Sequence, residues 1–217
     1  MKLEKYIDHT NLKQDATKGD IEKLCKEAKE HDFASVCVNP CWVSFCKSLL
    51  EKTSVKVCTV IGFPLGATDT ETKAFEAKKA VQNGASEVDM VINVGYAKNG
   101  DWEKVENDIK SVVKSAKEEN ENTIVKVILE TCLLTNEQIE KACYCAQNAK
   151  SDFVKTSTGF STAGATVQNV TLMKNTVGNS MKVKAAGGIR DKATALSMIE
   201  AGADRIGTSN GIAIVTL

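Results

Sequence analysis

Residues 87–94 read EVDMVINV, and the alternating polarity of this run decides the predicted fold. One parity is apolar and holds Val88, Met90, Ile92 and Val94. The other parity holds Glu87, Asp89 and Asn93. Because successive side chains of a strand point to opposite faces, one face meets an apolar layer and the other meets something polar. A strand of this kind is typical of a barrel that carries chemistry at the top of its interior.

The same kind of run recurs along the chain, in alternation with stretches whose apolar residues have helical spacing. The predicted strands are 6–10, 35–38, 55–61, 87–94, 124–131, 153–157, 181–186 and 205–209. The predicted helices include 20–30 and 101–117. We therefore expect an α/β fold, a (β/α)8 TIM barrel that forms a single domain over residues 1–217 and ends in a short helix.

An open, doubly wound parallel sheet is the structural alternative, because it also has buried β-branched strands. Its dinucleotide fingerprint G-x-G-x-x-G is absent from the sequence. The run 124–131 repeats the polarity of 87–94, with Lys126 and Glu130 opposite Val125, Val127 and Leu129. A second strand with a polar face favours the closed barrel.

Several helix ends have recognisable local signals. Thr68 with Glu71 and Thr135 with Gln138 match capping boxes at helix starts. Gly84 and Gly202 stand where helices should end in a left-handed residue.

Charge and composition limit the classes of partner. The 28 Lys and Arg residues equal the 28 Asp and Glu residues, so no overall field favours nucleic acid or a membrane surface. The first ten residues lack the apolar core of a signal peptide, and no apolar run approaches the roughly 18 residues that span a bilayer. We expect a cytoplasmic protein whose eight cysteines stay reduced thiols and, without a C-x-x-C pair, hold no structural zinc.

Four neighbouring predicted strands each offer a charged side chain of inward parity: Asp89, Lys126, Lys155 and Lys184. A structural network of ion pairs is the plain alternative for any one lysine. Several together favour a site, where a neutral lysine amine condenses with an aldehyde or ketone. Lys155 and Lys184 stand near the ends of their strands, whereas Lys126 should lie lower, as a partner of Glu130 or Asp89.

Glycine-rich segments follow the last two predicted strands. They read GGIR at 187–190 and GTSNG at 207–211. In many barrels the loops at these two positions bind phosphate through backbone N–H groups, which glycine allows to approach the anion. The sequence therefore predicts a phosphate site beside the lysines.

Motifs along nearly the whole chain resemble the deoxyribose-phosphate aldolase family. They are IDHTNL at 7–12, SVCVNP at 35–40, VIGFPLG at 60–66, EVDMVINVG at 87–95, KVILETCLL at 126–134, FVKTSTGF at 153–160, VKAAGGIR at 183–190 and AGADRIGTSNG at 201–211. The pair VKTSTGF and VKAAGGIR is the most specific. The parity of the strands leaves open which of Lys155 and Lys184 attacks, and the resemblance selects Lys155.

The resemblance implies a lyase of deoxyribose phosphate degradation that cleaves 2-deoxyribose 5-phosphate to glyceraldehyde 3-phosphate and acetaldehyde. Lys155 would form the Schiff base, Lys184 would favour its neutral amine, and Asp89 would assist proton transfer. The substrate and its phosphate would be bound by Asp8, Thr10, Thr158, Gly159, Gly187, Gly188, Gly207, Ser209 and Asn210. Some family members carry Lys where this chain has Phe160, so one cation for the phosphate is missing.

Three alternative functions remain at this point. A metal-dependent aldolase would need a set of His and carboxylate ligands, whereas the chain has only His9 and His31. A phosphosugar isomerase on the same scaffold would use a carboxylate base, and a degenerate barrel would bind a phosphosugar without turnover. We expect no metal and no cofactor. The sequence leaves open whether the chain forms a homodimer or a higher homo-oligomer.

Overall fold

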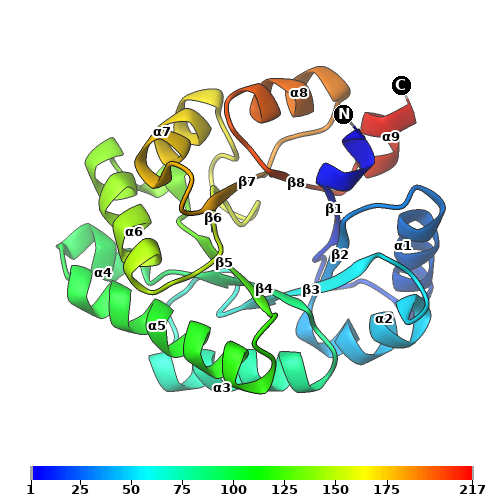
Figure 1. Cartoon of the computed structure of the whole chain (residues 1–217), viewed down its shortest axis with the longest axis horizontal. Helices are drawn as coiled ribbons and strands as arrows, with labels where there is room; N and C mark the ends of the chain where they lie inside the picture. The colour runs from blue at the N-terminus through cyan, green and yellow to red at the C-terminus, as the bar shows by residue number, and fades with distance from the viewer. Residues whose placement is uncertain (1, 217) are drawn as a thin grey trace.

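The computed structural model describes residues 2–216 and confirms the barrel. Eight parallel strands follow one another around a closed ring in chain order, and β1 pairs with both β2 and β8 (Figure 1). The strands are β1 (Ile7–Asn11), β2 (Ser35–Val38), β3 (Lys56–Ile61), β4 (Glu87–Val91), β5 (Ile124–Ile128), β6 (Phe153–Lys155), β7 (Lys182–Ala186) and β8 (Arg205–Thr208).

Helices surround this ring, as Figure 1 shows. They are α1 (Lys18–Glu30), α2 (Val43–Leu50), α3 (Thr70–Gln82), α4 (Val94–Asn99), α5 (Trp102–Glu119), α6 (Asn136–Asn148), α7 (Val167–Val177), α8 (Lys192–Glu200) and α9 (Gly211–Thr216), with short 3-10 turns η1 (Leu3–Tyr6), η2 (Pro40–Trp42) and η3 (Thr131–Leu133). The expected short final helix is α9, which lies beside η1 and β1.

Residues 2–216 form two separate apolar regions that stabilise the fold. The larger one lies between the strands and the helices and contains outward-facing strand residues such as Val88, Met90 and Val127. The smaller one fills part of the barrel interior and contains Leu12, Cys37, Cys58 and Val60, with Phe63 packed against it. The interior is therefore apolar beside β2 and β3, which leaves the remaining sector for charged side chains.

Four predicted strands end earlier in the structure than the sequence indicated, β8 by a single residue at Thr208 and three others by more. β4 ends at Val91, because the Asn93 side chain accepts a hydrogen bond from the backbone N–H of Tyr96 (3.1 Å) and caps α4. β5 ends at Ile128, and Glu130 has a left-handed backbone with φ 56°. β6 ends at Lys155. Asn93 and Glu130 belong to the loops above the strands, where functional side chains of barrels lie.

The helix-end predictions were right in part. Thr135 and Gln138 form the predicted capping box at the start of α6, and Gly84 and Gly202 have positive φ. The predicted box of Thr68 and Glu71 was wrong. Asp69 is the N-cap of α3 and accepts a hydrogen bond from the Thr72 N–H (2.9 Å), because a carboxylate one residue later caps as well as a threonine does.

A buried ion pair joins α3, α5 and the end of β4. The Lys73 Nζ lies 2.6 Å from the Asp108 Oδ2 and donates a hydrogen bond to the Val91 carbonyl oxygen (3.0 Å). Both charged side chains are almost inaccessible to solvent. The pair ties α3 and α5 to the last residue of β4.

We expect Lys73→Met to lower the free energy of unfolding by about 3 kcal/mol or more, because it leaves the Asp108 carboxylate buried without its cation. The double variant Lys73→Met/Asp108→Leu should recover most of the loss, since no unpaired charge remains. Urea denaturation followed by circular dichroism measures both. Equal stability of the single and double variants would contradict this account.

Candidate active site

Lys155 stands at the end of β6 on the wall of a large cavity. The cavity has a volume of about 880 Å³ and opens at the carboxyl ends of the strands. The Lys155 side chain is only 4% exposed, and its Nζ donates a hydrogen bond to the Asp89 Oδ2 (2.9 Å). A primary amine is therefore held at the base of a cavity with little contact with water.

Asp89 receives three ammonium groups. Lys155 and Lys184 share its Oδ2, with Lys184 at 2.7 Å, and Lys126 lies 2.8 Å from its Oδ1. The Cys58 thiol also donates to Oδ1 (3.2 Å). Burial alone would raise the pKa of Asp89, but the ammonium groups outweigh it and hold the pKa well below its usual range. Asp89 is therefore a carboxylate at all ordinary pH values.

A second set of ion pairs lies below Asp89. The Lys184 Nζ is 2.6 Å from the Asp8 Oδ2, and the Asp8 Oδ1 accepts a hydrogen bond from the Arg205 Nε (2.8 Å). The Arg205 Nη2 donates to both oxygens of Glu87 (2.7 and 2.8 Å), and the Glu87 Oε2 is 2.5 Å from the Lys126 Nζ.

Together these contacts form a closed ring in which cations and carboxylates alternate. Its members are Asp89, Lys184, Asp8, Arg205, Glu87 and Lys126. Burial would lower the pKa of Lys184, but Asp8 and Asp89 outweigh it and raise that pKa, so Lys184 keeps its proton. Burial would likewise raise the pKa of Asp8, and Lys184 and Arg205 hold it below its usual value.

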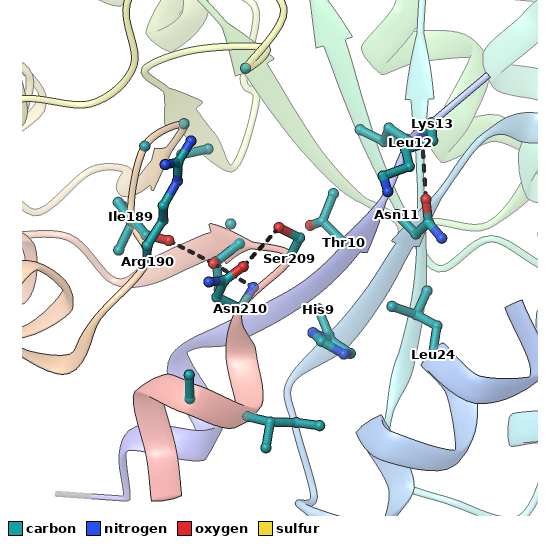
Figure 2. Close-up of a pocket in the computed structure, with 18 of the residues that line it drawn as sticks. His9, Thr10, Asn11, Leu12, Lys13, Leu24, Ile189, Arg190, Ser209 and Asn210 are labelled. Carbon is teal, nitrogen blue, oxygen red and sulfur yellow. Dashed lines mark hydrogen bonds between the residues drawn. The ribbon is translucent and has the colours of Figure 1, made fainter. Parts of the chain in front are cut away.

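The glycine-rich loops after β7 and β8 form another wall of the cavity. Gly187 and Gly188 have φ of 87° and 80°, a backbone that other residues rarely adopt. The Thr208 hydroxyl donates to the Ile189 carbonyl oxygen (2.7 Å) and accepts from the Asn210 N–H (2.9 Å), so the two loops are tied together. Figure 2 labels Ile189 and Asn210, the residues of the two loops that these bonds join, beside the cavity.

The loop after β6 completes the cavity. Glu130 accepts hydrogen bonds from the backbone N–H (3.1 Å) and the hydroxyl of Thr158, and the Phe160 N–H donates to the same hydroxyl (3.0 Å). Figure 2 shows Thr10 on β1 and Ser209 after β8 pointing into the same space. The cavity thus combines an amine, hydroxyl groups and glycine backbone, a set suited to a phosphorylated carbonyl compound.

The structure brings most of the predicted site residues to this cavity. Those that line it are Thr10, Lys155, Thr158, Gly159, Gly187, Gly188, Gly207, Ser209 and Asn210. Asp89 and Lys184 lie directly behind Lys155 and do not reach its surface. Asp8 was expected beside the sugar, but its carboxylate is fully buried and faces the ring, where Ser35 also donates to it (2.7 Å).

Two ring members, Glu87 and Arg205, were not among the predicted site residues. Each stands two positions before a residue of the site, Asp89 and Gly207, and strand parity therefore places it on the same inner face. That parity was the signal that could have found them. The expected pairing of Lys126 with Asp89 was right, but the alternative pairing with Glu130 was wrong, because Glu130 lies beyond the strand and binds Thr158.

One set of potential metal ligands occurs among residues 2–216. It consists of the Sγ atoms of Cys37 and Cys58 and a carboxylate oxygen of Asp89, which lie within 4.8 Å of one another. The Lys126 ammonium already contacts both Cys58 (3.4 Å) and Asp89. A divalent cation would meet that positive charge directly, so these residues do not fit a metal. His9 faces away from the barrel interior, with its Nε2 2.8 Å from Glu27 on α1.

Comparisons with known proteins agree with this geometry. The family model described as "DeoC/LacD family aldolase" matches residues 2–215. Deoxyribose-phosphate aldolase of Streptococcus pneumoniae is 61% identical over 215 residues, covering 99% of this chain and 96% of that protein. The enzyme of Carboxydothermus hydrogenoformans is also 61% identical, over 214 residues, covering 99% and 94%.

A solved structure is similar over almost the same span. The tetrameric deoxyribose phosphate aldolase from Aeropyrum pernix superposes with a TM-score of 0.91 at 36% identity, covering 98% of this chain and 89% of that one. In residues 2–216, no helix combines the length and the apolar character needed to cross a membrane.

The pKa values of the buried carboxylates predict how the free energy of unfolding depends on pH. Asp8 and Asp89 both have pKa values below those of the unfolded chain, so their contribution is complete above about pH 4 and is lost as pH falls towards their folded values. Below about pH 4 each should reduce the free energy of unfolding by about 1.4 kcal/mol per pH unit. Urea denaturation between about pH 2.5 and 5 measures the slope.

Asp89→Asn provides the control, because it removes one titrating group from both states. Whatever its absolute stability, its slope should be shallower than that of the unmodified chain by about 1.4 kcal/mol per pH unit. An unchanged slope would show that Asp89 is not held ionised in the folded protein.

Proposed function

Because this chain belongs to the DeoC/LacD family of aldolases, we propose that it cleaves 2-deoxyribose 5-phosphate through a Schiff base on Lys155. The products are glyceraldehyde 3-phosphate and acetaldehyde. The reaction class, a lyase of the deoxyribose-phosphate aldolase type, follows from 61% identity to curated enzymes of that name across 99% of the chain. The roles of individual residues rest on the geometry of the cavity.

One observation carries the choice of nucleophile. Of the lysines joined to Asp89, only Lys155 lines the cavity, whereas Lys126 and Lys184 have no exposed surface. The Lys184 ammonium shares the Asp89 Oδ2 with Lys155, and a second positive charge so close favours the neutral amine of Lys155. A neutral amine with little exposure to water is a nucleophile towards an aldehyde.

In the proposed reaction, the Lys155 nitrogen adds to C1 of the open-chain sugar and water leaves, which gives an iminium ion. A water in the cavity carries away the proton of the C3 hydroxyl, with Asp89 and Lys184 assisting from behind Lys155, and that proton returns to C2 of the enamine in a later step. The C2–C3 bond then breaks and its electron pair moves into the iminium, which forms an enamine on Lys155 and releases glyceraldehyde 3-phosphate. Protonation of the enamine at C2 and hydrolysis release acetaldehyde and restore the amine.

The remaining lining residues orient the substrate. The backbone N–H groups of the loops after β6, β7 and β8 bind the phosphate, and the residues concerned are Gly159, Gly187, Gly188, Gly207, Ser209 and Asn210. Thr10 and Thr158 stand nearer the sugar hydroxyls. Asp8 does not contact the sugar in this proposal; it positions Lys184 through their ion pair.

The alternative functions have less support. An isomerase needs a carboxylate base at the substrate, but Asp89 is held ionised by three ammonium groups and is a weak base. A barrel that only binds a phosphosugar has no use for a lysine at the base of the cavity. The A. pernix relative is a tetramer, and we expect this chain also to form a homo-oligomer, a dimer or larger, in the cytoplasm.

Borohydride reduction in the presence of acetaldehyde tests the Schiff base. We expect a stable ethyl adduct on Lys155 by peptide mass analysis, at the same level with and without EDTA. Lys155→Ala should abolish it, and Lys184→Met should reduce it at least about a hundredfold while Lys155 is still present. The exposed Lys192→Ala is the matched control and should react normally. A folded chain that forms no adduct, or forms it elsewhere, would refute the proposal.

The position of Phe160 predicts a gain of affinity. Its side chain is 56% exposed at the cavity rim and stacks edge-on against Phe63, with ring centroids 5.2 Å apart. Phe160→Lys adds a cation beside the phosphate loops, so the KM for 2-deoxyribose 5-phosphate should fall about two- to fivefold. The KM for unphosphorylated 2-deoxyribose should not change. An equal effect on both substrates would place the phosphate elsewhere.

A further inference from the structure

Arg205 and Glu87 lie at the lower side of the charged ring, and neither lines the cavity. We propose that they are positioning residues that complete a neutral ring of ion pairs, in which each cation contacts two or more carboxylates while Lys155, outside the ring, contacts only Asp89. The inference rests on the proposed function, in which Lys155 must lose a proton before it attacks. On this inference, the reactivity of Lys155 depends on the charges of Arg205 and Glu87, which do not contact the substrate.

Contacts within the ring show why Lys155 stands apart. Arg205 binds both oxygens of Glu87 and one oxygen of Asp8. The second oxygen of Asp8 pairs with Lys184, and Glu87 also pairs with Lys126. Each ring member therefore has a ring partner on both sides. Lys155 has only Asp89, whose two oxygens already contact Lys184 and Lys126.

The cluster carries one net positive charge while Lys155 is protonated. Three carboxylates face three ring cations, so the ring has no net charge, and the Lys155 ammonium adds one positive charge to a region with almost no exposed surface. Loss of that proton makes the whole cluster neutral. Lys155 is the member that loses it, because each of the other cations holds two carboxylates and Lys155 shares its only one.

Each of the eight strands contributes a titratable group to this region: Asp8, Cys37, Cys58, Glu87 with Asp89, Lys126, Lys155, Lys184 and Arg205. Cys58 stays a thiol, because burial raises its pKa and its proton is donated to Asp89. The neighbouring Cys58 lowers the pKa of Cys37, so the charge of Cys37 also has to be checked.

Two variants that change the charge of the ring in opposite directions distinguish this role from a purely structural one. Glu87→Gln keeps the shape but leaves one more positive charge in the cluster, so the Lys155 amine should become reactive at a pH about one unit lower. Arg205→Met removes a positive charge and should move that onset about one unit higher. The double variant Glu87→Gln/Arg205→Met restores the charge and should return the onset to its original position. Arg205→Lys, which keeps the charge, should not move it.

The measurement is the rate of acetylation of Lys155 by dilute acetic anhydride as a function of pH, relative to an internal amine standard and read by peptide mass analysis. It reports the proton of Lys155 whether or not the chain forms a Schiff base. Adduct formation with acetaldehyde is followed on the same samples. Absence of the adduct in the unmodified chain would overturn the proposed function alone, and the acetylation profile would still test the ring.

Two controls complete the design. Asp108→Asn breaks the buried Lys73 pair between helices and should destabilise the protein without moving the onset. Cys37→Ser should also leave the onset in place. The inference is overturned if Glu87→Gln and Arg205→Met shift the onset in the same direction or not at all, if the double variant does not restore it, or if Cys37→Ser moves it. If Arg205→Met does not fold, Glu87→Gln and Arg205→Lys alone decide the matter.

Discussion

A charge that leaves water must be compensated inside the protein, and this constraint is concentrated at Asp89. Its carboxylate is inaccessible to solvent and contacts three ammonium groups, from β5, β6 and β7. Strand register brings these groups together, because Asp89 stands opposite Lys126, and Lys155 stands opposite Lys184. Closure of the barrel brings together the remaining members of the charged ring. The pairing of β1 with β8 brings Asp8 beside Arg205, two residues that are 197 positions apart in the sequence.

The fold could be predicted because its information is local. The polarity of 87–94 and the recurrence of β-branched runs are enough to indicate eight strands, all of which the structure contains. The larger errors lie at the carboxyl ends of β4, β5 and β6. There the chain continues with residues that suit a strand, but a side-chain cap at Asn93 and a left-handed backbone at Glu130 turn it into a loop. The Glu130 turn is accompanied by a tertiary contact with Thr158, which no short window of sequence contains. The Asn93 cap on Tyr96 is local, but the apolar alternation that runs on to Val94 hides it.

The candidate site could also be predicted in part from local sequence. Inward parity identified Asp89, Lys155 and Lys184, and the structure joins all three directly. Parity does not say how deep a side chain lies, so Asp8 was expected at the sugar although its carboxylate belongs to the ring. Glu87 and Arg205 share the same inner face but are 118 positions apart. Their pairing needs a closed barrel, whose register the sequence does not state.

The place of Arg205 on the last strand links the chemistry of the cavity to the order in which the chain is made. A ribosome that has completed β1 to β7 has produced three carboxylates and three lysines of the cluster, whose charges cancel without Arg205. The excess positive charge arises only when β8 closes against β1. The strand that closes the barrel therefore also brings the last charge of the cluster, so the charge balance around Lys155 is complete only in the closed fold.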